Sequence, residues 1–83
     1  MNEEITRIHQ EIMLHTQTFR MKNRTPPKVW ISQDLFRELF GSYYGRHIVD
    51  KLYGWTYFGC PLEVVDAWEG MRYIVGYEGG TNQ

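Results

Sequence analysis

The residues best suited to chemistry in this chain are three histidines and one cysteine, and their spacing matches no catalytic or metal-binding pattern. His9 and His15 fall on different faces of a predicted helix, whereas a helical metal-binding pair uses i, i+4 spacing. His47 stands alone in the sequence. The sequence therefore predicts no metal site.

Cys60 lies between Gly59 and Pro61 inside apolar, strand-like sequence, which predicts a small buried thiol with a raised pKa. A single cysteine cannot form an internal disulfide or a four-thiolate zinc site. Glu63 and Asp66 are an odd number of residues apart in a predicted strand, so they point to opposite faces and make a poor acid and base pair. We expect no catalytic residues and no cofactor, and thus a protein that is not an enzyme.

A stretch of aromatic residues and glycines between Gly41 and Trp55 is the best candidate for a ligand or partner site. Stacking faces, a fixed cation and a titratable ring occur together there and suit a base, a sugar or a peptide. These residues are Tyr43, Tyr44, Arg46, His47, Tyr53 and Trp55. The alternative is that the rings are core residues and that Arg46 is a solvated cation. The glycines match neither a phosphate loop nor a dinucleotide fingerprint.

A short basic run offers a second candidate site. Four cations fall within nine residues and no acid lies among them: Arg20, Lys22, Arg24 and Lys28. The whole chain, however, carries nine Lys and Arg against ten Asp and Glu, a formal charge of −1. A nucleic-acid-binding protein normally has a basic surplus. We interpret the run as a solvated linker, with a nucleic-acid-associated module as the alternative.

The first element that positions these residues is a predicted helix over residues 3–22. One apolar stripe recurs at spacings of three and four: Ile5, Ile8, Ile12, His15 and Phe19. Glu3 and Glu4 lie at the N-terminus of this predicted helix, where the positive end of the helix dipole stabilises negative charge. The stripe either packs inside the fold or forms the interface of a homo-oligomer, and the sequence leaves both open.

Residues 23–28 form a linker, because Pro26 and Pro27 forbid a continuing helix. A short strand over 29–31 precedes a second helix that begins at Ser32. The buried stripe expected for this helix is Leu35, Phe36, Leu39, Phe40 and Tyr43. Residues 47–53 have a pattern that fits either a further helical turn or a strand.

The C-terminal third has the composition of β structure. A strand over 55–58 is interrupted at Gly59-Cys60-Pro61 and resumes over 62–66, and a four-residue turn then predicts an antiparallel hairpin with 71–77. Residues 79–83 read as a flexible tail. Together these elements predict one α+β domain with a helix (1–22), a linker (23–28), a core (29–78) with a small three-stranded sheet, and the tail.

Size and composition favour self-association. In a chain of 83 residues the burial of apolar surface and the loss of conformational entropy nearly cancel, so a contact between copies is a useful addition. The acidic start Met1-Asn2-Glu3-Glu4 is unlike a secretory signal, and no stretch has the roughly 20 apolar residues that a membrane span needs. We expect a cytoplasmic protein with no membrane partner.

Four segments of the C-terminal half carry a resemblance: Lys28-Val29-Trp30-Ile31-Ser32, Asp34-Leu35-Phe36, Phe58-Gly59-Cys60-Pro61-Leu62-Glu63-Val64-Val65-Asp66 and Tyr73-Ile74-Val75-Gly76-Tyr77. In these segments the chain resembles small phage- and prophage-encoded proteins. A similar order of strands and helix occurs near the end of phage major capsid proteins, and the likeness covers residues 28–77. The chain is too short for a capsid subunit. The resemblance implies a virus-derived accessory protein, in the host cytoplasm, that binds itself, a host protein or a small signalling ligand.

The sequence therefore predicts a homo-oligomeric protein that acts by binding a protein partner. Inhibition of a host factor is one form of this predicted binding. The alternatives are the nucleic-acid-associated module and a small-ligand sponge that holds a nucleotide in the 41–55 region.

Overall fold

The computed structural model describes residues 3–22, 25–52, 54–66, 68 and 72–77. Its elements, in chain order, are α1 (Glu3–Lys22), β1 (Lys28–Ser32), α2 (Gln33–Phe40), the 3-10 helix η1 (Tyr43–His47), β2 (Ile48–Lys51), β3 (Gly54–Tyr57), β4 (Cys60–Val65) and β5 (Tyr73–Gly76). The class is α+β, as the sequence predicts.

The strands form a single mixed sheet of five strands in the order β2-β3-β4-β1-β5. β1 runs parallel to β4 and antiparallel to β5, while β3 is antiparallel to both β2 and β4. The prediction of three strands is thus wrong in number. Two features of the chain account for the difference.

The first feature is a tight turn where the sequence suggested an interrupted strand. The pairing of Tyr57 with Cys60 leaves only Phe58 and Gly59 as the loop, and both have positive φ, 54° and 77°. Two-residue loops of this kind match the right-handed twist of the strands that they join. β3 and β4 are therefore two antiparallel strands instead of one strand with a bulge.

The second feature is the central place of β1. The predicted hairpin between residues 62–66 and 71–77 is wrong, because β4 and β5 lie on opposite sides of β1. Val29 is opposite both Leu62 and Val75. Val29 and Ile31 are fully buried, so the most apolar short strand takes a position with a neighbour on each edge. Most of the predicted turn, residues 67 and 69–70, lies outside the described residues.

Capping and a glycine shape the segment between β1 and β2. The Leu35 backbone N–H donates to the Ser32 hydroxyl oxygen (3.1 Å), which confirms Ser32 as the N-cap of α2. A Cβ at Gly45 would lie 2.3 Å from the Phe40 carbonyl oxygen, so only glycine allows the chain to pass so close to the end of α2. The chain then enters β2, so residues 48–51 adopt the strand alternative.

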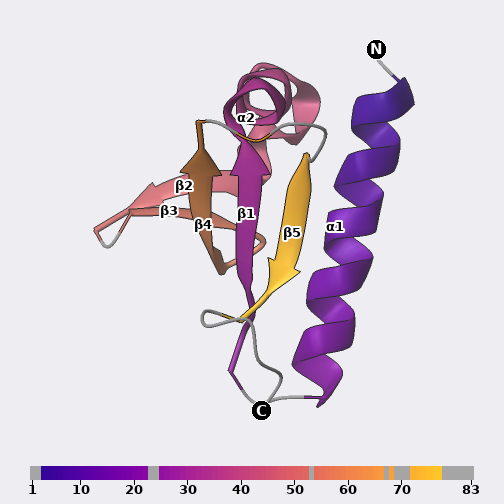
Figure 1. The fold of residues 1–83 in the computed structure, drawn as a ribbon, viewed down its shortest axis with the longest axis vertical. Coiled ribbons are helices and arrows are strands. Elements are labelled where there is room, and N and C mark those ends of the chain that lie inside the picture. The colour runs from indigo at the N-terminus through magenta and orange to yellow at the C-terminus, as the bar shows by residue number, and fades with distance from the viewer. Residues whose placement is uncertain (1–2, 23–24, 53, 67, 69–71, 78–83) are drawn as a thin grey trace.

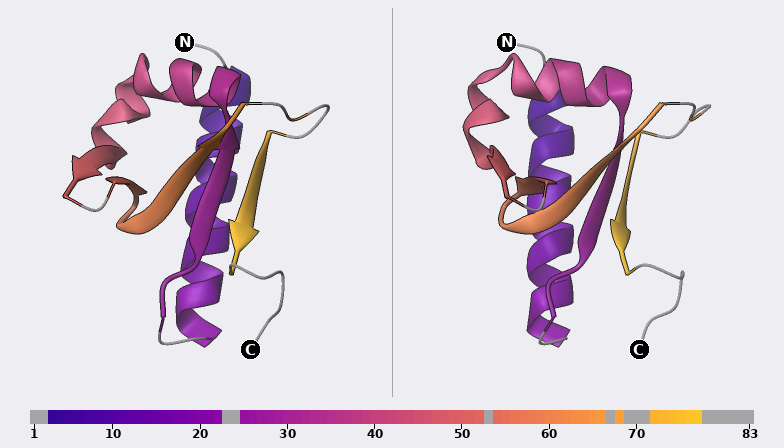
Figure 2. Two further views of the ribbon diagram at one scale, coloured as in Figure 1. Left: turned by 60° about the vertical axis from the view of Figure 1, so that its left-hand side comes forward. Right: turned by 90° about the vertical axis from the view of Figure 1, so that its left-hand side faces the viewer.

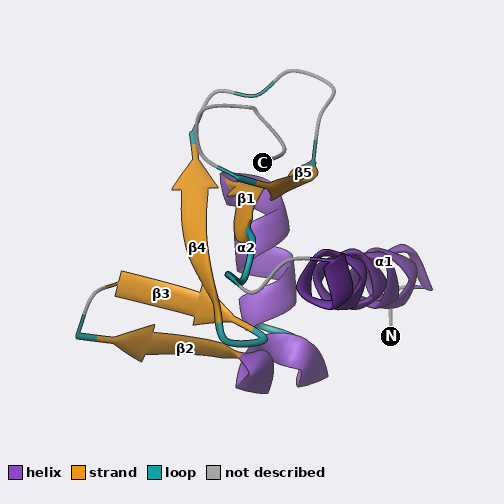
Figure 3. Cartoon of the chain, turned by 90° about the horizontal axis from the view of Figure 1, so that it is seen from below, coloured by secondary structure: helices purple, strands orange, loops and turns teal. Residues whose placement is uncertain are grey.

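α1 packs on the rest of the same chain. It runs alongside β5, and α2 lies across the end of the sheet where β1 and β4 finish (Figure 1, Figure 2). Ile5, Ile8 and Ile12 join one hydrophobic core with residues of β1, α2, β3 and β4. The β2–β3 hairpin lies crosswise to β4 and extends away from α1 (Figure 3). The molecule therefore has a side closed by α1 and an end formed by α2, η1 and the hairpin.

Candidate partner-binding surface

The residues predicted as one ligand site separate into three groups in the structure. Tyr44 and His47 turn towards the interior, while Tyr43 and Arg46 are exposed. Trp55 packs elsewhere, against side chains of α2. Tyr53 lies outside the described residues. The structure thus does not bring the described members of this set together around one cleft.

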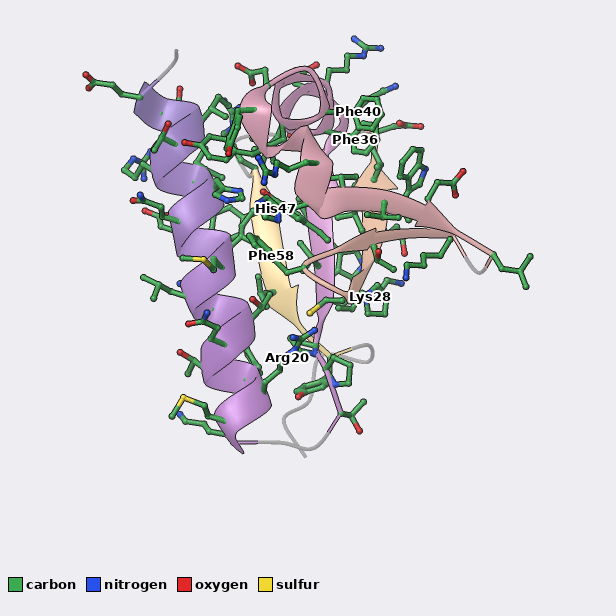
Figure 4. All side chains as sticks on the ribbon, turned by 180° about the vertical axis from the view of Figure 1, so that it is seen from behind. Arg20, Lys28, Phe36, Phe40, His47 and Phe58 are labelled. Atoms are coloured by element: carbon green, nitrogen blue, oxygen red, sulfur yellow. The ribbon has the colours of Figure 1, made fainter. Side chains whose placement is uncertain are left out.

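The inward group belongs to a cluster of five rings, which we call the histidine cluster: His9, Tyr44, His47, Tyr57 and Phe58. The His9 ring stacks on Tyr44, with centroids 4.0 Å apart, and its Nδ1 lies 2.7 Å from the Tyr57 hydroxyl oxygen. His47 stacks on Phe58 at 4.9 Å, and its centroid is 5.2 Å from that of His9 (Figure 4). His47 is therefore not isolated, because folding brings α1, η1 and β3 together there.

Burial sets the charge state of this cluster. Desolvation, followed by the nearby His47, lowers the pKa of His9 from 6.5 to about 4. Burial also raises the pKa of Tyr57. Both rings are consequently neutral near pH 7, and the hydrogen bond between them satisfies two buried polar groups. The cluster joins three elements through packing, and its five residues include no Ser, Thr, Cys or Lys.

The outward aromatic group lies on α2 and β3. Phe36 and Phe40 stack at 5.6 Å, and Trp55 meets both rings edge-on, at 5.4 and 5.6 Å. Leu35 and Leu39 of the predicted stripe are fully buried, but Phe36 is only half-buried and Phe40 is 50% exposed. The prediction that the whole stripe is buried is therefore wrong for its aromatic members.

Large apolar side chains continue from Phe40 along the chain to the hairpin. Tyr43 is 61% exposed, Val49 is 43% exposed and Leu52 is 93% exposed. We call the four exposed residues Phe40, Tyr43, Val49 and Leu52 the α2–hairpin surface. Val49 projects from the face of the hairpin opposite Trp55 and Phe40, because it alternates with Asp50, the partner of Trp55. The Arg46 guanidinium lies over the Tyr43 ring, 4.6 Å from its centroid, and adds a cation to this surface.

The predicted interface residues of α1 have different environments. Ile5, Ile8 and Ile12 are buried within the chain. The apolar stripe of α1 therefore packs inside the fold, which is one of the two arrangements that the sequence left open. His15 is exposed and meets the Tyr73 ring edge-on at 5.9 Å. Phe19 is half-buried and meets the Tyr77 ring at 5.5 Å.

The basic run does not form a stripe. Arg20 donates to the Phe58 carbonyl oxygen (2.8 Å) and to the Cys60 sulfur (3.4 Å), which fastens the end of α1 to the β3–β4 turn (Figure 4). Lys28 pairs with the Glu63 carboxylate at 2.7 Å. Lys22 is exposed, and Arg24 lies outside the described residues. Two of the four predicted cations are thus engaged within the fold.

Other site chemistry is limited in the described part of the chain. Cys60 is buried and burial raises the pKa of its thiol, which confirms the predicted setting of this residue. Across residues 3–22, 25–52, 54–66, 68 and 72–77, no three His, Cys, Asp or Glu side chains gather as metal ligands would. The same residues include no helix with the length and apolar character of a membrane span.

Comparisons of the chain with protein-family models, with curated proteins and with solved structures find no significant match.

The sequence does not mark five residues as members of these two aromatic groups: His9, Phe36, Phe40, Tyr57 and Phe58. Phe36 and Phe40 are four apart in a helix, which is the spacing of a stacked pair, so this signal was present. His9 follows buried Ile8 and carries no local signal, because its partners come from residues far along the chain.

Proposed function

We propose that this protein is a non-enzymatic binding and assembly protein, which acts by self-association and by docking a protein partner. The observation that carries the proposal is the α2–hairpin surface. Four large apolar side chains are exposed within residues 40–52, and exposed apolar side chains that are grouped in this way mark contact sites. Aromatic side chains and arginine, which occur together here, are the residue types enriched in protein interfaces.

The internal chemistry of the fold agrees with a binding role. Two titratable rings of the histidine cluster, His9 and Tyr57, are buried and lie within hydrogen-bond distance of each other, and Cys60 is a buried thiol whose pKa is raised. Groups of this kind stabilise a fold and are poorly placed to react with a substrate. The resemblance of residues 28–77 to phage proteins adds an accessory role in a virus, such as blocking a host protein, to the proposal.

The test is the mass of the purified protein in solution, measured by native mass spectrometry and by light scattering over a range of concentrations. We expect a multimer for the unaltered chain and a shift towards monomer for Phe40→Ser and Leu52→Ser. Leu14→Ser is the matched control, since Leu14 is also exposed (57%) but lies on α1. A strict monomer at every concentration would contradict the proposal.

A further inference from the structure

β2 is an edge strand with backbone groups that face away from the sheet. It pairs with β3 on one side, and it is the outermost strand in the sheet order. The Phe58 N–H donates to the His47 carbonyl oxygen (3.3 Å), so residues 47 and 58 are a hydrogen-bonded pair. Because such pairs alternate along an antiparallel ladder, Val49 and Lys51 also bond to β3. Ile48 and Asp50 therefore direct their backbone groups outward.

From this edge we infer that β2 pairs antiparallel with β2 of a second copy, about a two-fold axis at Val49, to form one continuous sheet. The inference rests on the proposed function and adds its partner and geometry. In this register Asp50 lies opposite Ile48 of the other copy. The Asp50 N–H of each copy then donates to the Ile48 carbonyl oxygen of the other. The Ile48 N–H already bonds to the Gly45 carbonyl oxygen within its own chain.

Charge and backbone shape select this register over its neighbours. A two-fold axis at Asp50 would set two carboxylates opposite each other, and an axis at Lys51 would set two ammonium groups opposite each other, and both arrangements destabilise a strand pair. An axis at Ile48 would make the two Ile48 residues a hydrogen-bonded pair, but their N–H groups already bond to the Gly45 carbonyl oxygens of their own chains. An axis at Val49 opposes no like charges.

The exposed apolar residues fit the same arrangement. Antiparallel pairing brings the tip of one hairpin beside the start of the other β2. The most exposed of these residues, Leu52 (93%), then lies beside η1 of the other copy, where the Arg46 guanidinium covers the Tyr43 ring. The two Val49 side chains meet at the axis. One two-fold contact thus covers Val49 and Leu52 of the α2–hairpin surface in both copies.

Cysteine cross-linking tests the geometry. Residue 49 would form a non-hydrogen-bonded pair with Cα atoms about 4.5 Å apart, which is a distance that a disulfide spans. With glutathione disulfide as oxidant, we expect Val49→Cys to give a covalent dimer at least tenfold faster than Leu14→Cys. The unaltered chain, whose single cysteine is buried, should not cross-link. Asp50→Cys, one residue along, tests the register and should react no faster than Leu14→Cys.

Proline at position 50 provides a second test that needs no oxidation. The Asp50 N–H points away from β3, so Asp50→Pro removes the contact between copies and keeps the ladder within the chain. We expect a folded monomer by light scattering. If the unaltered chain is a multimer but Val49→Cys cross-links no faster than Leu14→Cys, or Asp50→Pro stays a multimer, this geometry is wrong and the proposed function stands. If the unaltered chain is a monomer throughout, both fail.

Discussion

The side of the molecule closed by α1 and the end formed by α2 and the hairpin use similar side chains in opposite ways. Beneath α1, rings and polar groups have partners in the same chain: the Tyr73 hydroxyl donates to the Glu11 carboxylate (2.8 Å) and the Tyr44 hydroxyl to the Thr6 hydroxyl (2.9 Å). At the hairpin end, Phe40, Tyr43 and Leu52 face solvent. Aromatic content alone therefore does not distinguish an interior from a contact surface.

The contrast separates stability from assembly. Substitutions beneath α1 should lower the free energy of unfolding, whereas substitutions at the hairpin end should change the oligomeric state with little effect on folding. The following variants test this division, from the largest expected effect to the smallest.

Truncation of the buried stripe should have the largest effect. Ile12 is fully buried, so Ile12→Ala should lower the free energy of unfolding by about 2–5 kcal/mol and Ile12→Val by about 0.5–1.5 kcal/mol. Urea denaturation measures both. Leu14→Ala, on the exposed face of the same helix, should change it by less than about 0.5 kcal/mol. Equal losses at positions 12 and 14 would show that α1 does not close this side.

Acid should weaken the same side through His9. The pKa of His9 is 6.5 in the unfolded chain and about 4 in the native core. Between pH 6.5 and pH 4, His9 therefore binds a proton in the unfolded chain but stays neutral in the native chain. Stability from this group is complete above pH 6.5. It declines by on the order of 3 kcal/mol as the pH falls towards 4, and it is level below that.

Urea denaturation at several pH values measures this decline. His9→Gln should flatten the slope between pH 6.5 and 4, while the matched His15→Gln variant keeps His9 and should retain it. An unchanged slope in His9→Gln would assign the pH dependence to other groups.

The contact between Arg20 and the β3–β4 turn should have a smaller effect. Arg20→Met keeps much of the aliphatic stem but loses the bond to the Phe58 carbonyl oxygen, and it should lower the free energy of unfolding by about 1 kcal/mol. Lys22→Met, an exposed cation in the same helical turn, is the control and should have almost no effect. A reversed order would mean that the turn does not need α1.

Phe40→Ser should affect stability least. Half of the Phe40 side chain is already in solvent, so the loss should stay below about 1 kcal/mol even though the ring contacts Phe36 and Trp55. Thermal denaturation of a dilute, monomeric sample measures this value without a contribution from assembly. A loss as large as that of Ile12→Ala would place Phe40 in the core and erase the contrast between the two regions.

Local patterns predicted those parts of the fold that local physics determines. The stripe of Ile5, Ile8 and Ile12 and the Ser32 cap follow from helical spacing and from one hydroxyl, and the structure confirms them. Phe58 favours strand by propensity, yet it adopts positive φ because the β3–β4 turn requires it. Such a position depends on tertiary pairing, which single-residue preference does not encode.

The candidate site was only partly predictable for the same reason. The stretch 41–55 is rich in aromatic rings, but the spacing of these rings does not reveal which of them face inward. Tyr44 is half-buried because α1 supplies His9 and Thr6 as its neighbours, whereas adjacent Tyr43 has no such cover and is exposed. That choice is made by an element more than thirty residues earlier in the sequence.

The central place of β1 has a consequence for synthesis of the chain. β1 ends at Ser32, but its neighbours end only at Val65 and Gly76. During translation, both edges of β1 can be paired only after almost all of the remaining sequence has been made. An unpaired strand edge can pair with another chain and so promotes aggregation. A nascent chain halted before Tyr73 would keep one edge of β1 bare, so the last strand made completes the protection of the first.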